Sequence, residues 1–193
     1  DIQTLLSGLA DSYLYKDILA TENLRKPDLL DKLLRALAYQ VGSEVSYNEL
    51  AQTVGSDSKT VEKYIELLEK CFIIFRLNGL NRNLRTELKK SKKIYFYDNG
   101  IRNAVIRQFA PLEMRNDVGA LWENFFISER IKRNHYQQYY CNVYFWRTQS
   151  QQEIDFIEER NGVMSIFEMK WNPKKAKIII PESFTKAYPV KET

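Results

Sequence analysis

The spacing of apolar residues changes along the chain from a helical repeat to a strand repeat. In residues 28–40 and 59–72, leucine, valine, isoleucine and aromatic side chains recur every three or four positions, which predicts amphipathic helices. Residues 142–147, 153–157 and 163–171 instead form short strand-like runs separated by turn signals. The sequence therefore predicts a mixed fold of the α/β (α+β) class, with its helices concentrated early and its strands late.

The length and composition exclude several classes of protein. With 193 residues, of which 44% are hydrophobic, the chain has room for one large domain or two small ones. No run approaches the roughly 18 consecutive apolar residues that a membrane span requires. Residues 1–9 lack the basic start and apolar core of a secretory signal. We therefore expect a cytoplasmic protein with no membrane partner.

Histidine and cysteine are too scarce to support the chemistry for which they are best known. The chain has a single histidine, His135, which excludes a multi-histidine metal site and leaves almost no material for a histidine-based triad. Cys71 and Cys141 have apolar or aromatic neighbours in the sequence, and we expect both to be buried thiols rather than a disulfide framework. Catalysis by this chain would therefore rest on carboxylates and lysines.

Basic residues are concentrated in one segment. Residues 76–93 contain seven basic residues and one acidic residue, a net charge of +6, whereas the rest of the chain has a net charge of −2. A local basic segment favours an anionic partner, with DNA as the first candidate, although a lysine-rich loop kept polar for solubility has the same composition. The candidate DNA-binding residues in this segment are Arg76, Arg82, Arg85, Lys89, Lys90, Lys92 and Lys93.

The elements predicted around this segment follow the order of a winged helix-turn-helix. A helix over 28–40 is followed by a capping box at Ser46 and Glu49, which begins a short second helix. A third helix, a strand, the basic segment and a second strand follow; their predicted ranges are 59–71, 72–77, 76–93 and 93–97. In such a module the third helix lies in the major groove and the basic loop contacts phosphates.

The charge of the third helix weakens this DNA interpretation. Lys59 and Lys63 are candidate DNA contacts, but Glu62, Glu66 and Glu69 would bring carboxylates towards the phosphate backbone. A winged helix that contacts protein or forms a dimer is therefore an alternative.

A glutamate on a later helix is flanked by apolar side chains. The helix predicted over residues 118–133 places Glu123 between two arcs of hydrophobic residues. A partly buried carboxylate needs a partner, and a salt bridge to lysine or arginine is the simplest one.

Two carboxylates and a lysine are predicted to meet on a β-hairpin. Glu168 and Lys170 are two positions apart on one strand, so their side chains share a face. Antiparallel pairing across the turn at Asn161 and Gly162 can bring Asp155 close to Glu168. Such a group predicts a site for Mg²⁺ or Mn²⁺, with the lysine orienting water or stabilising a phosphoryl group. The alternative is a cross-strand ion pair on a solvated face.

These residues resemble a known motif. Asp155, then Glu168 and Lys170, with Glu123 on a preceding helix, resemble the site of the restriction-endonuclease-like superfamily. A wider set of blocks, from about residue 13 to 188, resembles the C-terminal region of a family of bacterial and archaeal AAA+-type ATPases whose tail is a domain of unknown function. The blocks are YLYKDI (13–18), LAYQVG (37–42), SYNELA (46–51), KTVEKYIELL (59–68), KIYFYD (93–98), WENF (122–125) and YFWR (144–147).

The resemblance implies a domain organisation. Residues 1–27 would be a helical linker from an ATPase domain, 28–97 a winged helix-turn-helix, and 98–193 a restriction-endonuclease-like α/β domain that lacks its last element. No glycine in the chain is followed by lysine, so the chain has no P-loop, and ATP would bind only to the ATPase domain that is absent here. That ATPase domain is an expected partner.

The resemblance also implies roles for individual residues. Asp155 and Glu168 would be metal ligands, Lys170 would stabilise charge or orient water, and Glu123 would be a further ligand or orient water. The implied function is metal-dependent cleavage of DNA phosphodiesters. The alternative is a non-catalytic module that binds DNA or protein, regulates the ATPase and assembles it into a homo-oligomer.

Overall fold

The computed structural model describes residues 1–10, 12, 27–80, 91–148, 150–172 and 180–188. Over these residues the fold is mixed α/β, as predicted. The elements in chain order are α1 (Ile2–Leu9), α3 (Pro27–Tyr39), β1 (Glu44–Val45), α4 (Tyr47–Val54), α5 (Ser58–Lys70), β2 (Ile74–Gly79), β3 (Lys92–Phe96), α7 (Asn99–Ile106), the 3₁₀ helix η2 (Leu112–Met114), α8 (Val118–Tyr136), β4 (Asn142–Arg147), β5 (Glu153–Arg160), β6 (Val163–Phe167) and α9 (Glu182–Ala187).

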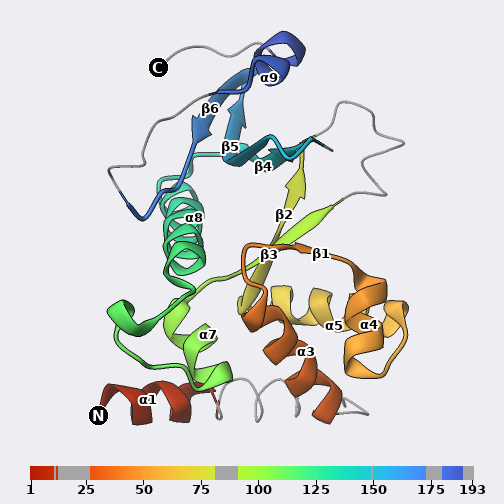
Figure 1. The fold of residues 1–193 in the computed structure, drawn as a ribbon, viewed down its shortest axis with the longest axis vertical. Coiled ribbons are helices and arrows are strands. Elements are labelled where there is room, and N and C mark those ends of the chain that lie inside the picture. The colour runs from red at the N-terminus through yellow and green to blue at the C-terminus, as the bar shows by residue number, and fades with distance from the viewer. Residues whose placement is uncertain (11, 13–26, 81–90, 149, 173–179, 189–193) are drawn as a thin grey trace.

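One six-stranded sheet runs through both halves of the chain, in the order β1-β3-β2-β4-β5-β6 (Figure 1). Neighbouring strands are antiparallel except β2 and β4, which pair in parallel through Asn78 with Tyr144 and Gly79 with Phe145. The predicted domain boundary at residue 97 falls between β3 and α7, and the sheet continues across it. This parallel junction brings β5 and β6 into the same sheet as β3.

The early helices form because their apolar faces pack together. In α3 the residues Leu30, Leu33, Leu34 and Leu37 are fully buried, as the helical spacing predicts. The predicted N-cap of α4 is also observed, since Ser46 Oγ accepts a hydrogen bond from the Glu49 backbone N–H at 3.4 Å. These helices lie together at one end of the molecule (Figure 1).

Helix α8 is fixed against the sheet by polar and apolar contacts. The buried Asn124 side chain accepts a hydrogen bond from the Phe96 backbone N–H and donates one to the Phe96 carbonyl, at 2.7 and 3.0 Å. It thereby satisfies backbone groups of β3, as a neighbouring strand would. Ile127 packs one turn later into the cluster that contains Phe145 and Phe156. The position of Glu123, next to Asn124, is consequently set by the sheet.

Two sequence expectations need correction. Strand β6 ends at Phe167, whereas the strand predicted over 163–171 would have included Glu168 and Lys170. The hydrogen-bond ladder between β5 and β6 stops because Asp155 Oδ2 accepts a hydrogen bond from the Met169 backbone N–H at 2.9 Å. A neighbouring strand would otherwise accept this hydrogen bond. Cys71 and Cys141 are thiols that are only partly buried, whereas both were expected to be buried. Among the described residues, no helix is both long and apolar enough to cross a membrane.

Candidate functional site

Asp155, Glu168 and Lys170 meet near the start of β5 and just beyond the end of β6. The register pairs Phe156 with Phe167, so Asp155 stands opposite Glu168, as the predicted hairpin requires. Lys170 Nζ lies 3.0 Å from Glu168 Oε2 and 3.7 Å from Asp155 Oδ2. We call Asp155, Glu168 and Lys170 the outer group, because Lys170 remains substantially exposed.

A second set of charges lies deeper, between α8 and the sheet. Glu123 Oε1 accepts a hydrogen bond from Tyr95 Oη at 2.6 Å and lies 3.3 Å from Lys93 Nζ. Lys93 Nζ also lies 2.6 Å from Glu153 Oε1. We call Lys93, Tyr95, Glu123 and Glu153 the inner group. The salt bridge predicted for Glu123 is therefore present, and its partner is Lys93.

A glycine makes room for the inner group. Gly42 adopts a positive φ of 74°, and a Cβ at this position would lie 3.4 Å from both Glu123 Oε1 and Tyr95 Cε1. Its backbone N–H donates to the Ile94 carbonyl on β3. A side chain at residue 42 would therefore be strained by the backbone conformation and would also press on the carboxylate.

A glutamate in each group has a raised pKa, which is typical of carboxylates that lie close to another negative charge. Burial raises the pKa of Glu168, and the neighbouring charge of Asp155 raises it further, against the opposing effect of Lys170. Burial also raises the pKa of Glu123; Lys93 and Tyr95 oppose this rise, and the charge of Asp155 adds to it. Because Asp155 raises the pKa of both glutamates, the two groups form one electrostatic unit that favours positive charge.

The two lysines supply part of that positive charge. Burial lowers the pKa of Lys93, but Glu123, Glu153 and Asp155 outweigh burial, and the net pKa is raised. The pKa of Lys170 is raised in the same way by its two carboxylate neighbours. Both side chains therefore remain ammonium ions at neutral pH.

The predicted DNA-binding residues do not share one environment. Lys93, in the inner group, is buried and thus unavailable to phosphates. Arg76 Nη2 pairs with Glu69 Oε2 at 2.5 Å, and Lys92 Nζ lies 4.6 Å from the centre of the Tyr47 ring. The candidates that lie outside the described residues are Arg82, Arg85, Lys89 and Lys90.

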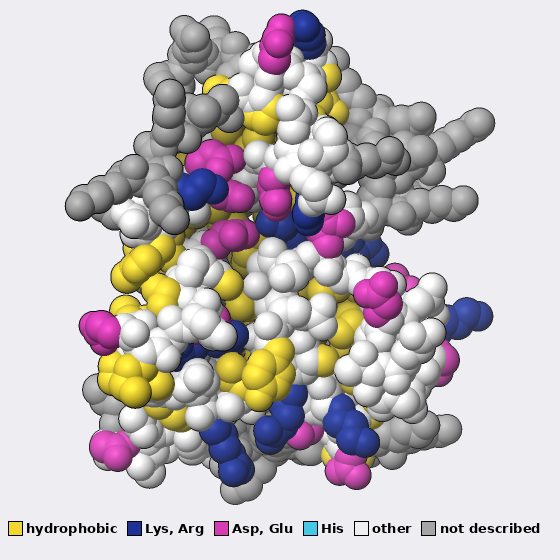
Figure 2. All heavy atoms as spheres, in the orientation of Figure 1, with side chains coloured by type: hydrophobic (Ala, Val, Ile, Leu, Met, Phe, Trp, Pro, Cys, Tyr) yellow, Lys and Arg dark blue, Asp and Glu magenta, His cyan; other side chains and the backbone are white. Residues whose placement is uncertain are grey.

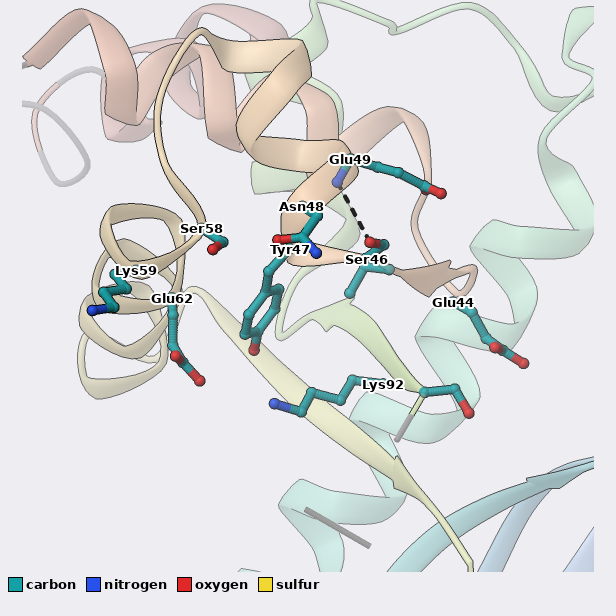
Figure 3. Close-up of a pocket in the computed structure, with 11 residues that line it drawn as sticks. Glu44, Ser46, Tyr47, Asn48, Glu49, Ser58, Lys59, Glu62 and Lys92 are labelled. Carbon is teal, nitrogen blue, oxygen red and sulfur yellow. Dashed lines mark hydrogen bonds between the residues drawn. The ribbon is translucent and has the colours of Figure 1, made fainter. Parts of the chain in front are cut away.

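Lys59 and Lys63 are exposed on α5, as the DNA interpretation requires. Lys59 lines an open pocket of about 680 Å³ between β1, α4, α5 and β3. Figure 3 shows Tyr47 and Lys92 pointing into this space, with Glu62 on the facing helix. The lining residues include two lysines and three glutamates, so the charge of this pocket is mixed.

Comparison with known proteins places the chain in a family. A family model described as a domain of unknown function, DUF8612, matches residues 1–112, more than half of the chain. The chain belongs to this family. A second model, DUF4143, also described as a domain of unknown function, matches residues 118–192. The first match ends at Leu112, where η2 begins, and covers β1, β2 and β3; the second begins at Val118, the first residue of α8, and covers the outer group.

Curated relatives are similar in sequence but are uncharacterized. A protein of Mycobacterium tuberculosis is 28% identical over 139 residues, which are 69% of this chain and 30% of the relative. One from Haemophilus influenzae is 28% identical over 109 residues, 54% of this chain and 27% of the relative. The chain thus spans less than a third of the length of these relatives. No solved structure matches it.

Sequence reasoning missed three members of the inner group. The sequence places Lys93 in the basic segment and gives Tyr95 and Glu153 no evident role. A signal was present, because Lys93 and Tyr95 are two positions apart in an otherwise apolar strand and so share one face. A lysine in such a strand usually has a carboxylate partner.

The outer group has the donor chemistry of a magnesium site, although it is small. Within the described residues, no group of three or more histidine, cysteine, aspartate or glutamate side chains is placed to hold a metal ion. Asp155 and Glu168 provide two carboxylates, and Mg²⁺ is commonly bound through one or two carboxylates together with water and substrate phosphates. Each carboxylate has about four lone-pair positions, so the bonds to Lys170 and Met169 leave acceptor capacity.

Proposed function

We propose that this chain is the DNA-associated C-terminal module of an AAA+-type ATPase, and that its outer group cleaves phosphodiesters with a divalent cation. The observation that carries the proposal is the meeting of Asp155, Glu168 and Lys170, with Glu123 close enough for the charge of Asp155 to act on it. A sequence motif alone does not guarantee such convergence. Sequence resemblance supports the link to an ATPase.

The residues have distinct roles in this proposal. Asp155 and Glu168 hold Mg²⁺ or Mn²⁺, which, when bound, stabilises negative charge on a phosphoryl oxygen and lowers the pKa of its water. Lys170 donates hydrogen bonds from its ammonium group to the phosphate that is cleaved and stabilises its negative charge. Glu123 is a positioning residue, because its carboxylate is held by Lys93 and Tyr95 and acts on the site through its charge.

The early half of the chain is the proposed DNA-docking part. The order α3, β1, α4, α5, β2, β3, with β3 between β1 and β2 in the sheet, supports a winged helix-turn-helix. Exposed Lys59 and Lys63 on α5 would contact phosphates.

A specific observation favours a second candidate function. Lys93 and Lys170 each lie between two carboxylates, so much of the negative charge is already neutralised by the protein itself. The same cluster would then be a structural ion-pair network in a non-catalytic module that binds DNA or protein and assembles the ATPase.

Nicking of supercoiled plasmid DNA separates these functions. We expect the protein to convert plasmid to the open circular form in Mg²⁺ or Mn²⁺ but not in EDTA. Asp155→Asn and Lys170→Ala should each lower the rate at least about a hundredfold, the loss expected when transition-state charge stabilisation is removed.

The matched control is Glu159→Gln, a carboxylate change on the same strand β5 outside the cluster. Glu159→Gln should cleave at the wild-type rate. If wild type and all three variants are equally inert while DNA binding persists, the second candidate function is correct.

A further inference from the structure

Three aromatic side chains form a patch at the surface of α8. The Trp122 and Phe125 rings stack with their centres 6.0 Å apart, and the Trp171 ring meets Trp122 edge-on at 5.9 Å. Phe125 and Trp171 are 49% and 52% exposed, respectively. Large exposed aromatic residues that touch one another form a contiguous apolar surface, which is characteristic of a binding site.

The patch is next to both charged groups in the sequence. Trp171 directly follows Lys170, and Trp122 directly precedes Glu123, so each tryptophan is adjacent in sequence to a charged member of the site. Figure 2 shows hydrophobic side chains on the left of this face, next to a gathering of acidic and basic side chains. A molecule whose phosphate reaches Lys170 would therefore have its neighbouring atoms beside the aromatic rings.

The two neighbouring surfaces match the two parts of a nucleotide. The Lys170 ammonium is suited to a phosphate, and an exposed aromatic face is suited to a nucleobase, which stacks on it whatever its sequence. Trp122 is anchored, because it packs against the buried cluster of Phe145 and Phe156. The Trp122 ring is therefore held in place and supports the half-exposed rings of Phe125 and Trp171, so the surface is preorganised for stacking.

We propose that Trp122, Phe125 and Trp171 form a base-stacking platform, and that the nucleic acid bound beside the outer group is single-stranded DNA. This inference rests on the proposed function, since it names the substrate of the same site. Bases inside a duplex are already stacked on both faces and cannot lie on a protein ring without being unpaired. The platform therefore selects single strands or unpaired ends.

The acidic residues beside the platform weaken the binding of a phosphate when no cation is present. Asp155, Glu168, Glu123 and Glu153 outnumber Lys93 and Lys170, so the bare site repels phosphate. Stacking must then supply much of the affinity when no divalent cation is present. Ca²⁺ should strengthen binding by screening the carboxylates.

Fluorescence anisotropy of a labelled oligothymidylate, measured in EDTA and in Ca²⁺, tests the proposal. The wild-type protein should bind the single strand more tightly than a blunt duplex of equal length. Trp171→Ala should weaken single-strand binding about tenfold, the effect of losing one base stack. Trp171→Phe should retain most of the affinity, and Phe125→Ala should weaken it to a smaller extent.

Two controls make the result specific. Tyr136→Ala removes an aromatic residue that is 80% exposed at the other end of α8 and should bind like wild type. In EDTA, where no cation can bind, Asp155→Asn should bind the single strand at least as well as wild type, because it removes a negative charge. Single-strand binding with no cleavage would reject the nuclease and leave the platform standing.

Other outcomes reject the platform. Trp171→Ala with wild-type affinity would do so, as would equal affinity for the duplex. If Trp171→Ala abolishes concentration-dependent self-association seen by sedimentation and leaves strand binding unchanged, the patch is an interface between copies of the chain. Thermal unfolding of each variant establishes that it is folded.

Discussion

The inner and outer groups use the same chemistry, a lysine between two carboxylates, at two depths in the protein. The Lys93 side chain is 4% exposed and belongs to β3, which lies between two strands of the sheet, whereas the Lys170 side chain is 44% exposed and follows the end of a strand. A buried ion pair is fixed and strongly coupled to folding, while a half-exposed pair is weakly coupled and can exchange partners. Depth therefore separates a structural charge cluster from one that is open to a ligand.

The largest expected effect that tests this comparison is on stability. Lys93→Met leaves Glu123 and Glu153 without their shared cation, and should lower the free energy of unfolding by about 3 kcal/mol, as for other buried pairs that lose one partner. Urea unfolding followed by circular dichroism measures the change. Lys170→Ala, the matched change in the outer group, should cost less than about 1 kcal/mol. Equal losses in the two variants would contradict the distinction.

A smaller effect concerns pH. The pKa of Glu168 is raised in the folded protein, so the folded state holds its proton more tightly than the unfolded state does. This contribution favours folding below the unfolded pKa of about 4.3 and is lost as pH rises through the folded pKa. Glu168→Gln should therefore gain stability relative to wild type as pH rises from 4 to 7. Unfolding curves at several pH values would show the opposite trend if Glu168 were stabilised as a carboxylate.

The smallest expected effect is on cation binding. Lys170 competes with a divalent cation for Asp155 and Glu168, so Lys170→Ala should bind Mg²⁺ more tightly. Differential scanning fluorimetry should show a larger Mg²⁺-induced rise in melting temperature for Lys170→Ala than for wild type, because ligand binding stabilises the folded state. The rise should disappear in Asp155→Asn. A Mg²⁺ response that is unchanged in Asp155→Asn would place cation binding elsewhere.

Local patterns in the sequence predicted the local structure well. The leucines of α3, the Ser46 cap and the hairpin turn at Asn161 and Gly162 each depend on neighbours a few residues away. The outer group was predictable for the same reason, since a two-residue turn fixes which residue faces Asp155.

Long-range packing was not predictable in this way. The pairing of β2 with β4 joins residues that are more than sixty positions apart, and no local pattern specifies it. Lys93 was assigned to a solvated basic segment because its charge resembles that of its neighbours; its burial depends on α8 bringing Glu123 across the sheet. The early end of β6 likewise results from a side chain, that of Asp155, which replaces a backbone partner.

The parallel pairing of β2 with β4 also determines what would follow from cutting the chain between the two matched families. A fragment ending at residue 112 would keep β1, β3 and β2 but would lose β4, leaving the backbone N–H and C=O groups along one side of β2 without their strand partner. It would also uncover Leu77, which is fully buried in the intact chain. An open, apolar strand edge recruits other chains by β-sheet extension. We therefore expect such a fragment to aggregate more readily than the intact chain.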